Sequence, residues 1–239
     1  MGQFNEIRLP ATLDCNPINR IGGRLRICEV AIYRGPHIYS RTKMIRLQID
    51  LGVLEYWPTD WLPGFTGRLL ELLPGLHRHQ CSTGYEGGLV ERMQDGTWLG
   101  HVIEHVALEL QLMVGAVRIT RGKTRSVKGR PGVYNVMYAY QNEDVGLLAG
   151  RLALELVASL VAPLVTLEGA EKVHGAQLPV PFDFPASLAV LRETARKTRL
   201  GPTTGALVAE AERRGIPWQR LDDYSLIQFG TGRRQKRIR

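Results

Sequence analysis

The sequence has only three cysteines and no C-x-x-C pair. A small, odd number of cysteines argues against a disulfide framework and for a reducing compartment. A charged-then-apolar secretory leader is also missing, and the longest apolar stretch, residues 147–165, is interrupted by Arg151 and Glu155. Such a stretch is too polar to span a bilayer as a helix. We therefore expect a cytoplasmic protein with no membrane partner.

Acidic residues are fewer than basic ones, so the formal net charge is +8. Five of the positive charges lie in residues 233–239, which leaves +3 for the rest of the chain. A basic nucleic-acid-binding function would rest on this tail and on the Arg- and Lys-rich segment 121–130, but no recognised nucleic-acid module precedes them. Nucleic acid is therefore the weakest of the partners that we consider.

Internal repeats and low-complexity segments are absent, and the order of the remaining patterns predicts an α+β fold with a small, mostly antiparallel sheet packed by helices. Alternation of apolar and polar residues is clearest in residues 45–50, which is typical of a half-buried strand. The expected strands are 24–35, 43–51, 116–122 and 132–140, and the expected helices are 63–75, 86–96, 97–114 and 142–161.

The chain divides into four parts. Residues 1–23 contain prolines and a Gly-Gly pair without periodicity, and we expect a mobile extension. Residues 24–162 form the main domain, and residues 163–185, rich in proline and glycine, form a linker. Residues 186–239 read as two helices followed by two short strands, an incomplete second α/β unit.

The helix expected at 97–114 carries the spacing H-x-x-E-H at His101, Glu104 and His105. At about 100° per residue the two histidines lie about 40° and one turn apart, so both imidazoles can reach one ion. Zinc binds neutral histidine nitrogens, and this spacing is the inverted zincin signature, in which the glutamate is the general base. The alternative is structural: the histidines bond neighbouring carbonyls and the glutamate pairs with an arginine.

A zinc site needs a third protein ligand, and Glu143 is our first choice. It begins the helix that directly follows a strand of the expected sheet, so its side chain could point back at the histidines. Glu155 is as well explained by an ion pair with Arg151 at i−4. His79 and Cys81 are alternatives for the third position, although a loop histidine and a small buried thiol would be ordinary structural residues.

Several motifs in one order resemble a known family. The segments "AIYRGPHIYS", "GGLVERMQDGTWLGHVIEHVALELQ" and "GRPGVYNVMYAY" resemble the amino-terminal domain of cyanophycin synthetases, and residues 199–238 resemble the start of the ATP-grasp region of that family. The similarity runs from about Leu25 to the last residue. It implies an enzyme that builds a storage polymer, a poly-aspartate backbone with arginine on each side-chain carboxylate, by ATP-driven amide bond formation. It also implies that the amino-terminal domain handles the growing chain.

The chain departs from that family where ATP chemistry would begin. It lacks the glycine-rich phosphate-covering loop and the Mg²⁺-binding carboxylates of an ATP-grasp, and no segment reads G-x-x-x-x-G-K-[ST]. Without these groups the chain cannot hold the phosphates and Mg²⁺ that phosphoryl transfer requires. We therefore expect no ATP binding and no ligase activity from this chain alone.

Two functions follow from the resemblance and the motif. The first is a module that binds the aspartate–arginine polymer, with Arg118, Arg121 and Arg125 as candidate contacts. The second is a zinc-dependent hydrolase of the same polymer, in which Glu104 is the general base and the products prime synthesis. The expected partners are the polymer and either the remaining synthetase domains or a second copy of the chain.

Overall fold

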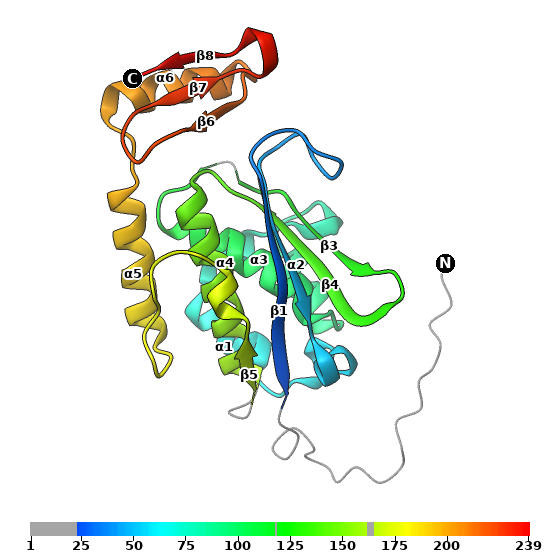
Figure 1. Ribbon diagram of the computed structural model, residues 1–239. Helices are drawn as coiled ribbons and strands as arrows, with labels where there is room; N and C mark the ends of the chain where they lie inside the picture. Colours follow the sequence, from blue (N-terminus) through cyan, green and yellow to red (C-terminus); the bar gives the residue numbers. More distant parts are fainter. Residues whose placement is uncertain (1–22, 118, 162–164) are drawn as a thin grey trace, which may run out of the picture.

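The computed structural model describes residues 23–117, 119–161 and 165–239 (Figure 1). Nearly all of the predicted amino-terminal extension, as well as Arg118, lies outside these residues. The strands are β1 (Arg24–Tyr33), β2 (Met44–Asp50), β3 (Gly122–Val127), β4 (Arg130–Ala139), β5 (Thr166–Glu168), β6 (Trp218–Arg220), β7 (Ile227–Phe229) and β8 (Lys236–Ile238). The α-helices are α1 (Phe65–Leu72), α2 (Gly88–Gln94), α3 (Leu99–Met113), α4 (Glu143–Val161), α5 (Phe184–Lys197) and α6 (Pro202–Arg213).

The main sheet has five strands in the order β3-β4-β2-β1-β5. β1, β2, β4 and β3 pair antiparallel, whereas β5 is parallel to β1. In β2, Ile45, Leu47 and Ile49 are fully buried, and the residues between them are only partly buried. This alternation turns one face of the sheet toward the helices.

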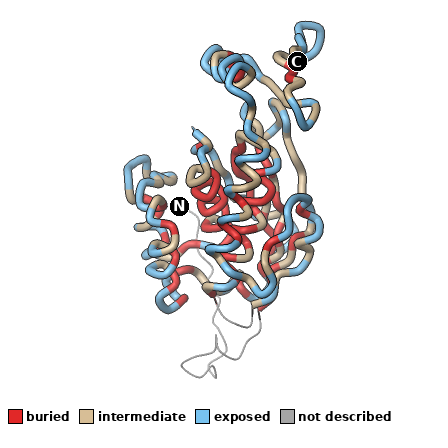
Figure 2. The backbone as a smooth tube through the Cα atoms, turned by 90° about the vertical axis from the view of Figure 1, so that its left-hand side faces the viewer, coloured by how far each residue is buried: buried red, intermediate tan, exposed pale blue. Residues whose placement is uncertain are grey.

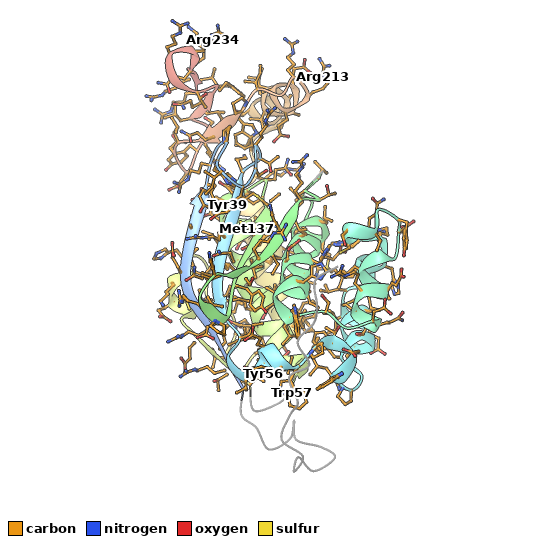
Figure 3. All side chains as sticks on the ribbon, turned by 90° about the vertical axis from the view of Figure 1, so that its right-hand side faces the viewer. Tyr39, Tyr56, Trp57, Met137, Arg213 and Arg234 are labelled. Atoms are coloured by element: carbon orange, nitrogen blue, oxygen red, sulfur yellow. The ribbon has the colours of Figure 1, made fainter. Side chains whose placement is uncertain are left out.

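Helices α3 and α4 cover that face, and the short elements between residues 52 and 94 form a further layer against α3 (Figures 1 and 3). Two glycines allow α4 to approach the sheet closely. A Cβ at Gly150 would come within 1.9 Å of the Tyr138 hydroxyl, and a Cβ at Gly146 would come within 2.8 Å of Ile45. The Tyr138 hydroxyl donates to the carbonyl of Gly146 at 3.0 Å, so this buried polar group is satisfied.

Buried residues are concentrated in the main domain, where α3 is buried on almost every side (Figure 2). The polar side chains of a helix enclosed in this way are shielded from water, whereas those of an ordinary surface helix face the solvent. Among the described residues, no helix combines the length and the apolar character needed to cross a membrane.

The C-terminal unit comprises α5, α6 and a second sheet in the order β6-β7-β8. It is much more exposed than the main domain, and Arg213 and Arg234 lie at its far end (Figures 2 and 3). The predicted fold class, α+β with a mostly antiparallel sheet and a smaller second unit, is confirmed.

Three strands differ from the expectation. β3 occupies residues 122–127, inside the segment that we expected to be a basic turn, rather than 116–122. Its exposed positions are Lys123, Arg125 and Ser126, so the apolar alternation that identifies most strands is missing at this sheet edge. β5 lies within the expected linker and β8 within the basic tail, and both have only three residues. Strands this short carry too little pattern to be recognised.

Candidate metal centre

Three side chains from two elements bring metal-ligand atoms together. One ligand atom each from Cys81, His101 and His105 lies within 4.8 Å of the other two. The histidines are on the first half of α3, and the cysteine begins the 3-10 helix η5 (Cys81–Thr83). The H-x-x-E-H spacing thus places its two histidines beside a thiol rather than beside Glu143.

The backbone at Cys81 is unusual, with a φ of 53°. A non-glycine residue in the left-handed region is uncommon and costs about 1 kcal/mol or more. The following residues close a tight loop, since a Cβ at Gly88 would overlap the side chain of Thr83 at 1.7 Å. This loop holds the Cys81 thiol 3.2 Å from Nε2 of His101.

His101 is largely enclosed between that thiol and Thr97, whose hydroxyl oxygen lies 3.0 Å from Nδ1. Burial, followed by the nearby Arg92 cation, lowers the pKa of His101 to about 4. The imidazole is therefore neutral at physiological pH, which is the form that binds a metal.

His105 is buried and contacts a second histidine. Its Nδ1 lies 2.9 Å from Nδ1 of His79, whose Nε2 lies 3.0 Å from the carboxylate of Glu109. Burial, followed by the neighbouring His101 and His79, holds the pKa of His105 well below its usual range. Glu109 had not been considered from the sequence, although its position four residues after His105 places both on one helix face.

Glu104 lies on the side of α3 that faces β3. Thr124 donates its hydroxyl to the carboxylate at 2.6 Å, and a Cβ at Gly122 would come within 2.1 Å of Oε1. Burial raises the pKa of Glu104 to about 7, and the Thr124 hydrogen bond opposes that shift. A carboxylate with a pKa near neutrality can both accept and return a proton, which is the property of a general base.

The donor set suits zinc. Zn–S and Zn–N bonds of about 2.3 and 2.0–2.1 Å in a tetrahedron place ligand atoms roughly 3.3–3.7 Å apart. The separation of 3.2 Å between the Cys81 sulfur and His101 Nε2 is close to this value. Three protein ligands leave a fourth position for water or substrate, as in catalytic zinc sites.

Glu143 is not brought to the histidines. It begins α4 and makes a bidentate ion pair with Arg34, whose Nε and one terminal nitrogen each lie 2.6 Å from a carboxylate oxygen. The expectation failed because a first-turn side chain of α4 faces the loop after β1 rather than α3. Glu155 pairs with Arg151 at 2.9 Å, as the i−4 spacing indicated.

Arg121 and Arg125, two of the candidate polymer contacts, are exposed at the edge of the main sheet. Arg121 immediately precedes β3, and Arg125 lies within it on the same face as Lys123. The intervening Gly122 and Thr124 face α3. The third candidate, Arg118, lies outside the described residues.

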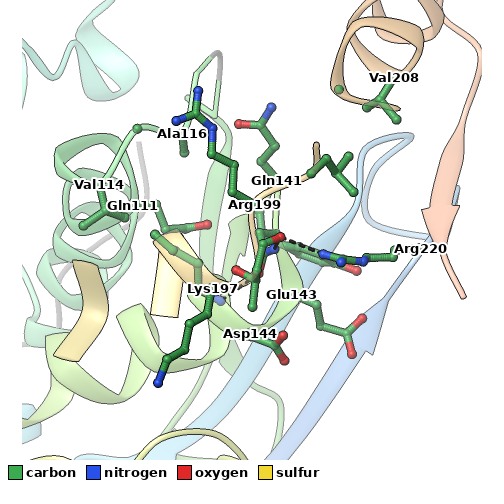
Figure 4. A pocket seen from close by; sticks show the side chains of 18 of the residues that line it. Gln111, Val114, Ala116, Gln141, Glu143, Asp144, Lys197, Arg199, Val208 and Arg220 are labelled. Carbon is green, nitrogen blue, oxygen red and sulfur yellow. Dashed lines mark hydrogen bonds between the residues drawn. The ribbon is translucent and has the colours of Figure 1, made fainter. Parts of the chain in front are cut away.

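A cleft of about 1380 Å³ opens at the other end of α3, between the main domain and the C-terminal unit (Figure 4). Its walls carry both signs of charge, including Glu143, Asp144 and Arg220. Lys43 lies in this cleft with its ammonium 3.7 Å from the ring centre of Trp218. Burial lowers the pKa of Lys43 to about 8.

Comparison with known proteins gives one family and several relatives. Residues 46–162 match the family model "Cyanophycin synthase-like N-terminal domain". The chain is 39% identical over 220 residues to the cyanophycin synthetases of Crocosphaera subtropica and Trichormus variabilis, and over 217 residues to that of a Synechocystis species. Each alignment covers 90% of this chain, but the chain spans only 22–23% of the length of these relatives.

Proposed function

Since residues 46–162 belong to the family of cyanophycin synthase-like N-terminal domains, we propose that the chain binds the aspartate–arginine polymer and hydrolyses its amide bonds at a zinc site. Cys81, His101 and His105 are the ligands, and Glu104 is the general base. Glu143, the ligand first expected from the sequence, has no place in this site.

One observation carries the proposal: ligand atoms of Cys81, His101 and His105 lie within 4.8 Å of one another. Two neutral imidazoles and a thiol supported by a strained backbone form a donor set that binds zinc in preference to magnesium or calcium. The left-handed conformation at Cys81 supports the same proposal, because strained backbone positions cluster at functional sites.

The metal would supply a Lewis acid that makes water nucleophilic near neutral pH and polarises the scissile carbonyl. Glu104 accepts a proton from the attacking water and transfers it to the leaving nitrogen as the C–N bond breaks, giving a carboxylate and an amine. Thr124 holds the carboxylate of Glu104 in place through its hydrogen bond.

The charge of the nearby surface suits the polymer. β3 places Gly122 and Thr124 against Glu104, while Arg121, Lys123 and Arg125 are exposed on its other side. Each unit of the polymer that the family resemblance implies carries a guanidinium and the free α-carboxylate of its arginine. A strand that links a cationic edge to the general base could hold such a chain beside the site.

A second candidate function is polymer binding without hydrolysis. The observation in its favour is that the clustered side chains already bond one another, with Thr97 on His101 and Glu109 on His79. In that case His101 and His105 would be satisfied core residues. In either case, the polymer and the remaining regions of a synthetase are the implied partners.

The deciding experiment incubates the purified chain with the polymer and zinc, without ATP, and measures new chain ends. We expect internal cleavage that depends on metal. Glu104→Gln should reduce cleavage about 10²-fold or more while retaining metal and polymer binding, because a general base is not a ligand.

Glu71→Gln provides the matched control, since Glu71 is an exposed glutamate on α1 and the same chemical change there should leave cleavage intact. If the wild type binds polymer and zinc but releases no new ends, the hydrolase proposal is wrong and the binding function remains. If it binds no zinc, the metal site itself is wrong.

A further inference from the structure

A hydrogen-bonded chain leads from the candidate ligand His105 through the largely buried His79 to the buried Glu109. Nδ1 of His105 contacts Nδ1 of His79 at 2.9 Å, and Nε2 of His79 contacts Glu109 at 3.0 Å. The side chains of His79 and Glu109 are only 11% and 5% exposed. Neither residue belongs to the cluster of ligand atoms.

The protonation states of these groups decide the direction of the hydrogen bonds. When Glu109 is ionised its carboxylate only accepts hydrogen bonds, and Nε2 of His79 then carries the proton that bonds it. When the His79 ring is also neutral, its other nitrogen is an acceptor, and Nδ1 of His79 then accepts from Nδ1 of His105. The lone pair of His105 is thereby left on Nε2, a nitrogen that makes no hydrogen bond to any of the described residues.

We propose that Glu109 and His79 are positioning residues, which keep the proton of His105 on Nδ1 and so present the Nε2 lone pair to the metal. The proposal rests on the proposed function in taking His105 as a ligand. Carboxylate and histidine partners behind a metal-binding imidazole orient the ring and increase its basicity.

The surrounding backbone holds this chain in place. Gly75, in the 3-10 helix η4 (Pro74–Arg78), lies so close to Glu109 that a Cβ there would come within 1.7 Å of Oε1. The nitrogen of His79 donates to the carbonyl of Leu76, and the carbonyl of His79 accepts from the nitrogen of Leu89, both at 3.1 Å. The loop thus positions the ring of His79 between α3 and the carboxylate.

Gly75 offers a way to disturb the carboxylate without removing a polar group. The three atoms nearest to a Cβ at this position all belong to Glu109, and the glycine is not in the left-handed region. Gly75→Ala should therefore displace the Glu109 carboxylate. Gly67→Ala is the matched control, since a Cβ at Gly67, on α1, would meet no atom within 4 Å.

The first measurement is the nitrogen-15 NMR spectrum of the histidine rings in the metal-free protein at neutral pH. It distinguishes a proton on Nδ1 from a proton on Nε2. We expect His105 to be protonated on Nδ1 and His79 on Nε2, with Glu109→Gln and Gly75→Ala each weakening that preference. Gly67→Ala should leave the spectrum unchanged.

The second measurement is the zinc affinity by competition with a chelator, with Co²⁺ absorption as a reporter of the ligand geometry. Glu109→Gln and Gly75→Ala should each weaken binding about 10- to 100-fold, as loss of such an outer partner typically does. Because both act on one carboxylate, Gly75→Ala should add little in the Glu109→Gln background. Glu71→Gln is the control for the amide substitution.

The outcomes separate this inference from the proposed function. Protonation of His105 on Nε2 in the wild type, or unchanged zinc affinity in both variants, would overturn the positioning role. If the wild type binds no zinc at all, the proposed metal site fails, whereas the NMR measurement still tests the arrangement of protons.

Discussion

The two ends of α3 face different environments and contain different chemistry. In its first half, Glu104 and His105 are buried, with exposed fractions of 5% and 7%. Beyond its C-terminal end lies the charged cleft, where Arg34 and Glu143 are paired with side chains that are 54% and 31% exposed. Burial therefore changes which protonation states are favoured in the first half of α3, whereas the Arg34–Glu143 pair beyond its other end keeps ordinary solvated charges.

The difference explains why the cluster is the better candidate for chemistry. Burial keeps the imidazoles neutral and brings the carboxylate of Glu104 to a pKa of about 7, so its groups can bind a metal and move protons. The cleft has more charges, and two of them, Arg34 and Glu143, neutralise each other in an ion pair. Lys43 is intermediate, because burial lowers its pKa to about 8 while the ring of Trp218 still stabilises its charge.

The largest expected effect comes from removing the thiol. Cys81→Gly relieves the left-handed backbone, since glycine adopts a φ of 53° freely, so the protein should fold at least as well as the wild type. It removes a ligand, so zinc affinity should fall by well over the roughly 100-fold typical of an outer partner.

The other end of α3 supplies the control for that substitution. Glu143→Gln, in the cleft, should leave zinc affinity unchanged when both variants are titrated against the same chelator. Loss of zinc in Glu143→Gln but not in Cys81→Gly would restore the ligand that the sequence first indicated.

The pH dependence of stability should reveal the buried carboxylate. Burial raises the pKa of Glu104 from 4.5 to about 7, so its protonated form stabilises the folded state below pH 4.5, and this contribution is lost as the pH rises through 7. Relative to the wild type, metal-free Glu104→Gln should therefore gain about 3 kcal/mol between pH 4.5 and pH 8. Urea unfolding of both proteins at several pH values measures this difference.

The contribution of His101 to folding stability changes with pH in the opposite direction to that of Glu104. Burial lowers its pKa from 6.5 to about 4, so its contribution is present above pH 6.5 and is lost as the pH falls through 4. Both proteins retain His101, so its contribution cancels in their difference. A difference between the two proteins that does not change with pH would mean that Glu104 is solvated like the charges of the cleft.

Displacing the carboxylate of Glu104 without changing its chemistry should impair cleavage of the polymer. A Cβ at Gly122 would come within 2.1 Å of Oε1 of Glu104, so Gly122→Ala should push the general base out of position. We expect polymer cleavage to fall about 10²-fold with zinc retained. Gly67→Ala is again the control, and cleavage by Gly122→Ala at the wild-type rate would argue against Glu104 as the base.

Much of the fold could be predicted because the sequence patterns that indicate its helices and strands are local. The alternation in β2 and the periodicity of α3 come from neighbouring residues that share one environment, and both elements appear where they were expected. β3 was misplaced because its exposed residues are the polar Lys123, Arg125 and Ser126, which are tolerated at a sheet edge. β5 was missed because only its pairing with β1 makes it a strand.

The candidate site was predictable only in part. His101, Glu104 and His105 are close in sequence and share one helix, so their spacing predicted that they lie near one another. Cys81 reaches them through a left-handed loop 20 residues earlier, a geometry that no periodicity indicates. Whether these residues hold zinc stays a prediction.

The smallest expected effect is in the cleft. The Arg34–Glu143 pair has good bidentate geometry, but both side chains are substantially solvated, and exposed pairs typically contribute about 0.2–1 kcal/mol. A double-mutant cycle with Arg34→Met and Glu143→Gln should give a coupling free energy in that range, which decreases with added salt because water and ions screen the pair. The Arg24–Glu168 contact, at 3.6 Å, is the reference and should give less. A coupling of several kcal/mol that resists salt would mean that the cleft is as desolvated as the cluster, and the contrast between the two ends of α3 would then disappear.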